Sequence, residues 1–90
     1  MPKYVIERTI PGVGAMAPAE LHATLRKSSQ VLHELGPQIQ WQQCYITGDK
    51  TYCVYIAPDA DLIREHARKV GLPADSVSEV VTVVDPATAE

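Results

Sequence analysis

The stretch 51-TYCVYIAPDADLIREHARKVGLP-73 decides the fold that we predict for this chain. Its first part, Thr51–Ala57, is rich in β-branched and aromatic residues, which favour a strand. Pro58 ends the strand because proline has no N–H for a ladder, and Asp59 is a favourable helix N-cap. A helix over Ala60–Val70 follows, and the glycine and proline after it end that helix. The stretch therefore predicts a strand that passes directly into a helix.

The same stretch carries the two most chemically suggestive residues, Cys53 and His66. At 100° per residue, His66 falls within the apolar stripe made by Leu62, Ile63 and Val70. The imidazole is therefore expected to face the protein interior.

Working outward, we predict a strand over Lys3–Ile10, a helix over Pro18–Leu35 and strands over Ile39–Thr47 and Ser76–Val84. With right-handed crossovers, the order βαββαβ gives an α+β, ferredoxin-like plait. Such a plait has a four-stranded antiparallel sheet with both helices on one face. Residues 1–90 then form a single domain, and we expect the tail, 85–90, to be frayed.

The turn between the second and third strands sets which side chains share a face of the sheet. If Gly48-Asp49 is a two-residue loop, Cys44 lies directly opposite Cys53. The other, more apolar face would then carry Trp41, Tyr45, Val54 and Ile56. A three-residue loop would instead place the two cysteines on opposite faces. We favour the first register because it separates polar from apolar side chains better.

Composition limits the classes of partner. The chain has 90 residues, a net charge of −3 and dispersed basic residues, which argues against nucleic acid and against an anionic membrane surface. No apolar run approaches a membrane span and the N-terminus does not resemble a leader, so a cytoplasmic location and two reduced cysteines are expected. A domain this small buries only about two-thirds of its unfolded surface, so a second copy is expected on the bare sheet face.

No catalytic residues can be assigned, because the sequence contains no nucleophile elbow, HExxH or paired CxxC motif. The best constellation is a metal site made by Cys53, His66, Glu7 and Glu79, since thiolate, imidazole and carboxylate suit zinc or nickel. Each residue also has a structural alternative. Cys53 would be a small buried hydrophobe, His66 a core histidine bonded to a backbone carbonyl, and the glutamates partners of Arg8 or lysines. Cys53 and His66 can share an ion only if Cys53 faces the helices.

Two rival functions remain open. The bare sheet face could hold an organic molecule in a pocket surrounded by Tyr55, Gln40, Gln42, Val5 and Glu7. The protein would then be a small dimeric α+β-barrel enzyme, such as a monooxygenase or an isomerase. Alternatively, the chain is an interaction module whose dimer surface is its whole purpose.

Several segments are similar to those of a known family. These segments are YVIER followed by PG, IQW, Tyr52-Cys53 with Ala57-Pro58, and REHAR with Gly71 and Pro73. The members of this family are small bacterial ferredoxin-like proteins of largely unknown function, and one is described as nickel-binding. The resemblance implies a homodimer that binds nickel or another divalent metal for storage or homeostasis, and no enzymatic activity. Cys53, His66 and Glu79 match the shared pattern. Leu72 and the pair Glu7-Arg8 depart from it, because the nickel-binding member is associated with histidines there.

Overall fold

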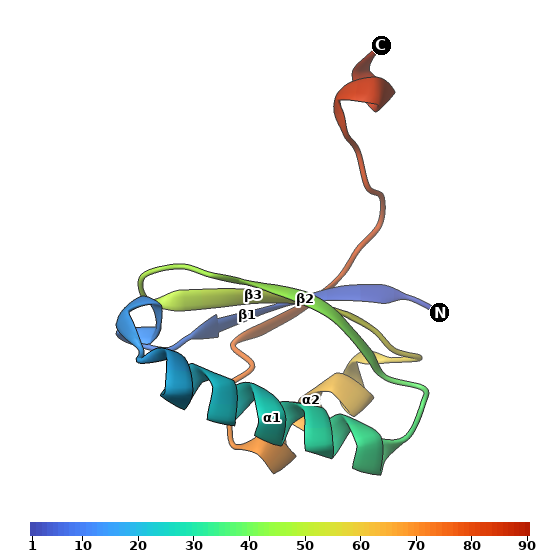
Figure 1. The fold of residues 1–90 in the computed structure, drawn as a ribbon. Coiled ribbons are helices and arrows are strands. Elements are labelled where there is room, and N and C mark those ends of the chain that lie inside the picture. Colours follow the sequence, from blue (N-terminus) through green and yellow to red (C-terminus); the bar gives the residue numbers. More distant parts are fainter.

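The structure, a computed structural model, describes all residues from 1 to 90. The elements follow the order βαββαβ, with two additional short 3-10 helices (Figure 1). Their bounds are β1 Lys3–Thr9, η1 Val13–Ala15, α1 Pro18–Leu35, β2 Gln40–Ile46, β3 Lys50–Ile56, α2 Ala60–Val70, β4 Ser76–Glu79 and η2 Pro86–Ala89. Both helices begin and end where the sequence predicts. The chain has no helix with the length and apolarity needed to cross a bilayer.

The four strands form one antiparallel sheet in the order β2-β3-β1-β4. Figure 1 shows α1 and α2 on the same side of this sheet, with the other side open. The predicted α+β, ferredoxin-like plait is confirmed. Alternation along β1 buries Tyr4, Ile6 and Arg8, which point to the helices, and places Val5 and Glu7 on the open face.

The core is small and lies between the sheet and the two helices. Its members are the buried side chains of Tyr4, Ile6, Ile39, Cys53, Tyr55, Ala57 and Ile63. Leucines of α1 are packed against this cluster but keep part of their surface exposed. α2 is fixed at both ends, since the Asp59 carboxylate accepts a hydrogen bond from the Leu62 N–H at 2.9 Å and Gly71 adopts a left-handed conformation.

The hairpin register follows the two-residue loop that we favour. Cys44 lies opposite Cys53, and the Thr47 N–H donates to the Lys50 carbonyl across Gly48-Asp49. One part of the prediction is wrong. A bulge between Trp41 and Gln43 adds one residue to β2, so Trp41 lies opposite Tyr55 and turns to the helix side. Trp41 therefore does not lie on the open face, where the sequence predicts it.

β4 is shorter than predicted, because it ends at Glu79 and not at Val84. Its last bond to β1 runs from the Val80 N–H to the Lys3 carbonyl. The chain then extends away from the sheet (Figure 1), with Val81 94% exposed. Near the C-terminus, Pro86–Ala89 form the exposed 3-10 helix η2. That the tail, 85–90, is frayed stays a prediction.

The loop after β1 is tied to the β2–β3 turn. The Ile10 N–H donates to the Asp49 carbonyl at 2.8 Å, and the Gly14 N–H donates to the Gly48 carbonyl at 3.0 Å. A Cβ on Gly14 would lie 2.5 Å from the Thr47 carbonyl oxygen, whereas a Cβ on Gly48 would meet nothing within 4 Å. Only glycine therefore allows η1 to approach the turn this closely.

Replacing Gly14 with alanine is expected to lower the free energy of unfolding by about 1–3 kcal/mol, the range for an inserted methyl that forces the backbone to shift. Gly48→Ala, at the other side of the same contact, is the matched control and should change it by less than about 0.5 kcal/mol. Urea denaturation measures both. Equal stability of the two variants would show that the close approach is not needed.

Candidate functional site

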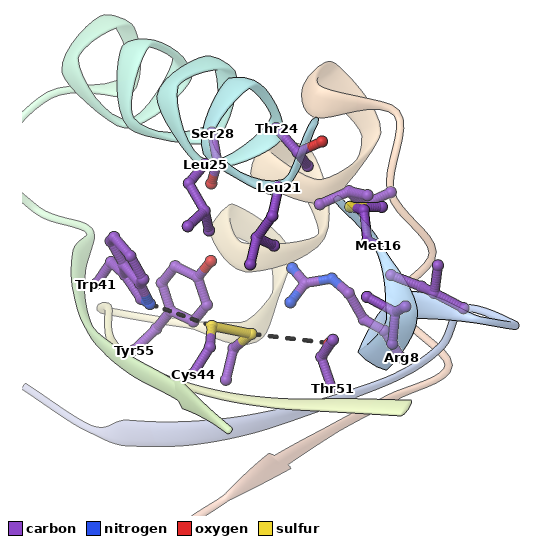
Figure 2. A pocket seen from close by; sticks show the side chains of 14 residues that line it. Arg8, Met16, Leu21, Thr24, Leu25, Ser28, Trp41, Cys44, Thr51 and Tyr55 are labelled. Carbon is purple, nitrogen blue, oxygen red and sulfur yellow. Dashed lines mark hydrogen bonds between the residues drawn. A yellow bond between two sulfur atoms is a disulfide. The ribbon is translucent and has the colours of Figure 1, made fainter. Parts of the chain in front are cut away.

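A cavity of about 120 Å³ lies between α1 and the sheet, next to the β2–β3 turn. Apolar side chains form most of its wall, among them Leu21, Leu25 and Met16. In Figure 2, Arg8 reaches into this space from β1, and Tyr55 and the two cysteines line the floor that β2 and β3 provide. The cavity is therefore on the covered side of the sheet.

This location corrects the pocket expected on the open face. Tyr55, which we placed there, is 2% exposed and points to the helices, because Thr51, Cys53 and Tyr55 alternate on the buried side of β3. The second hollow of the structure also borders α1, at its C-terminal end near Gly36 and Ile39. Neither hollow lies on the open face.

Cys44 and Cys53 form a disulfide, which corrects the expectation of two reduced thiols. The two-residue turn places the cysteines in register across β2 and β3 with their Cα atoms 4.0 Å apart, so the sulfur atoms meet. Trp41 donates its indole N–H to the Cys44 sulfur at 3.2 Å (Figure 2). The sequence places the two sulfurs opposite each other, but it does not reveal the bond between them.

His66 is fully buried on α2, as its place in the apolar stripe predicts. Its Nε2 lies 3.1 Å from the hydroxyl and 3.2 Å from the carbonyl oxygen of Ser28. A carbonyl can only accept, so the tautomer that satisfies it carries the proton on Nε2 and leaves Nδ1 as a lone pair. Nδ1 has no hydrogen-bond partner. Burial lowers the pKa of His66 and the nearby Arg8 charge lowers it further, while the Ser28 carbonyl opposes the shift.

The two glutamates lie elsewhere. Glu7 is on the open face, where it accepts a 2.7 Å bond from the Lys50 ammonium. Glu79 is exposed on β4 and lies 3.5 Å from the Tyr4 hydroxyl.

The structure therefore does not bring Cys53, His66, Glu7 and Glu79 into one cluster. The chain contains no group of three or more histidine, cysteine, aspartate or glutamate side chains placed to hold a metal ion. The structural alternatives are observed for two of them, a histidine bonded to a backbone carbonyl and a glutamate paired with a lysine. Cys53 is buried, but in a disulfide. Within a single chain the four side chains do not fit one ion, and their role as ligands stays a prediction.

Two residues of the cavity are not among the functional candidates that the sequence predicts. Arg8 shares the buried face of β1 with Tyr4 and Ile6. A charged residue among such apolar side chains indicates a buried charge that needs a partner. Cys44 was predicted opposite Cys53 but was not considered as its functional partner. Part of the remaining wall comes from η1 and α1, and no pattern in the sequence indicates that these two elements line one cavity.

Comparison with protein families gives a match over residues 4–80 to the family described as nickel responsive protein SCO4226-like. The chain belongs to this family. Among solved structures, the crystal structure of SCO4226 from Streptomyces coelicolor A3(2) is similar, with a TM-score of 0.76 and 16% sequence identity. The alignment covers 91% of this chain and 99% of that one, so the two share the whole fold. No curated protein sequence matches the chain.

The neutral, buried His66 predicts a pH dependence of stability. Because its folded pKa is lowered, the unfolded chain binds the proton more readily, and stability is lost as the pH falls below about 6.5 toward the folded pKa. One proton limits the loss to about 1.4 kcal/mol per pH unit. In His66→Gln, which keeps a polar group for Ser28, this loss should vanish.

Urea midpoints at several pH values between 7.5 and 5 measure the effect. His33→Gln, at an exposed position on α1, is the control and should retain the acid sensitivity of the unmodified protein. An acid sensitivity that persists in His66→Gln would assign it to other groups.

Proposed function

We propose that this protein binds a divalent transition-metal ion, with nickel as the first candidate, and acts as a homodimer in cytoplasmic metal storage or homeostasis. The observation that carries the proposal is the match to a nickel responsive family across residues 4–80. The fold supports it too, because the chain and SCO4226 share the full plait.

Within the chain, the soft donors are concentrated on the covered side of the sheet. Cys44 and Cys53 are adjacent across β2 and β3 and face the cavity. As a disulfide they offer no thiolate, whereas reduction would give two neighbouring thiolates, which are suitable donors for nickel or zinc. His66 offers a neutral nitrogen with an unpaired Nδ1 on the same side. We therefore propose that metal binding requires the reduced protein.

Carboxylate donors would come from the second copy. Glu7 lies on the open face, where two sheets would pack together, and Glu79 lies on the exposed part of β4. The open face also carries Val5, Val54 and Ile56, which are only partly buried in one chain. Apolar surface of this kind is stabilised by contact with a partner.

The C-terminal arm, residues 80–84, gives a second reason to expect a dimer. Val81, Val83 and Val84 are 94%, 70% and 70% exposed, although valine favours strands. Both outer strands of the sheet, β2 and β4, present unpaired backbone groups. An arm of one copy laid against the other copy would bury these valines and pair its own backbone.

Nickel binding is the first test. Reduced protein, freed of reductant under anaerobic conditions, should bind Ni²⁺ in calorimetry and develop nickel–thiolate absorbance in the near ultraviolet. Cys53→Ser should reduce this absorbance, because one of the two thiolates is lost, and should weaken binding at least about tenfold, the effect of losing roughly 1.4 kcal/mol of ligation.

Two controls sharpen the result. The oxidised protein should bind Ni²⁺ far more weakly, and His22→Gln, an exposed histidine of α1, should bind as the unmodified protein does. If neither redox form binds Ni²⁺, or if Cys53→Ser and His66→Ala both bind it unchanged, the proposed site is wrong.

The dimer is tested separately. Light scattering coupled to gel filtration should give about twice the mass of one chain, and removal of residues 81–90 should weaken the dimer at least about tenfold. Burial of even one valine side chain contributes roughly 1.5–3 kcal/mol, which is enough for this change. Removal of residues 85–90 alone keeps the valines and serves as the control. A full-length protein that stays monomeric at high micromolar concentration would refute the dimer.

A further inference from the structure

We infer that the cavity under α1 is a binding site for a small organic anion, a carboxylate on a compact apolar body, held by Arg8. Nothing in the family description concerns such a ligand. Arg8 is not one of the proposed metal ligands, although Cys53, which is one of them, forms part of the floor of the cavity.

The Arg8 guanidinium is isolated from hydrogen-bond partners. The side chain is 2% exposed, and both Nε and Nη2 are buried without a hydrogen-bond partner. Arginine stays protonated at every pH relevant to a protein, so this burial places a full positive charge in an apolar setting. Such a charge is strongly destabilising unless an anion or several acceptors meet it.

No acidic side chain of the structure pairs with Arg8. The ion pairs of the structure are Glu7 with Lys50 and Glu65 with Arg68, and neither includes Arg8. Glu7 is the next residue in the sequence, but alternation along β1 directs it to the opposite face. The ring of Tyr55 is an electron-rich neighbour, with its centroid 6.0 Å from the guanidinium carbon. A cation–π contact at that distance is at the limit of its range and does not replace a counter-ion.

The cavity under α1 is small and mostly apolar. The cavity of about 120 Å³ is somewhat smaller than the ~150 Å³ that admits benzene in an engineered protein core. Its wall is mostly apolar, with the hydroxyl-bearing residues Thr24, Ser28 and Thr51 as minor polar groups. Trp41 forms part of the wall and is 38% exposed, so the cavity borders solvent there.

Together these features specify the class of ligand. The forked N–H groups of arginine match the two oxygens of a carboxylate, and this pairing is bidentate and strong. The apolar wall requires a body without further charges. The volume limits the enclosed part of that body to a short branched chain or to part of one ring. Figure 2 shows the guanidinium directed toward the centre of the lining residues, between Tyr55 and α1. Benzoate and 3-methylbutanoate are suitable probes.

The test uses Trp41, the single tryptophan of the chain, as a local reporter. Titration of the full-length protein with benzoate and with 3-methylbutanoate should change Trp41 fluorescence, and calorimetry should give the affinity of at least one of them. Arg8→Met, which keeps the length of the side chain without its charge, should weaken that binding by about 10- to 100-fold, as expected for the loss of charged hydrogen bonds.

Arg8→Met also has a second readout. Without ligand it should melt at a higher temperature than the unmodified protein, because it removes an unpaired buried charge. Arg26→Met, at an exposed arginine of α1, should change neither affinity nor melting temperature. Leu25→Phe, which fills the cavity and leaves Arg8 in place, should also abolish binding, and it gives an answer if Arg8→Met does not fold.

Four results would overturn the inference. These are no binding of either carboxylate, equal binding by Arg8→Met, equal binding of the uncharged analogue benzyl alcohol, or an equal response to inorganic phosphate alone. The first two reject the role of Arg8, and the last two reject the combination of a carboxylate with an apolar body. None of them bears on nickel binding, which is tested by other variants.

Discussion

The register of β3 between β2 and β1 controls the rest of the structure. Because side chains alternate across a sheet, one choice of register sends Thr51, Cys53 and Tyr55 to the helices, and a slip of one residue would send them all to the open face. The two-residue turn at Gly48-Asp49 fixes this choice on one side, and the seven paired residues of β1 fix it on the other. The core, the disulfide and the floor of the cavity all follow from it.

Charge is distributed unevenly over the two sides of the sheet. On the open side, Glu7 and Lys50 pair where water can also solvate them, so their contribution to stability is small. On the covered side, Arg8 is buried without an acidic partner and His66 is kept neutral by burial, with the same arginine as a further cause. A fold that retains an unpaired cation in its interior carries a local conflict. Such conflicts are typical of functional sites, where a ligand resolves them.

The family assignment and the site geometry contribute different information. The name of the SCO4226-like family points to nickel. In the single chain, however, the four side chains proposed from the sequence as metal donors do not lie together, because the sheet separates some of them and others are bonded to different residues. The likeness to the SCO4226 crystal structure, at 16% identity, establishes the common plait only. The proposed dimer rests on a thin core, an open apolar sheet face and an exposed valine arm. Any ligand set that draws on Glu7 would have to be completed there.

The sequence by itself determined the elements of secondary structure and the topology. Local signals are strong here: Asp59 and Gly71 cap α2, Gly36 ends α1, and alternation marks β1 and β3. It also determined that His66 is buried, because helical periodicity places it in the apolar stripe of α2. It favoured Cys44 opposite Cys53, but that pairing depended on the length of the turn at Gly48-Asp49. Tertiary structure alone decided the bulge that turns Trp41, the early end of β4 and the enclosure of Arg8 under α1. These depend on which backbone or side chain lies across the gap, and a periodic pattern along one segment contains no information about its neighbour in space.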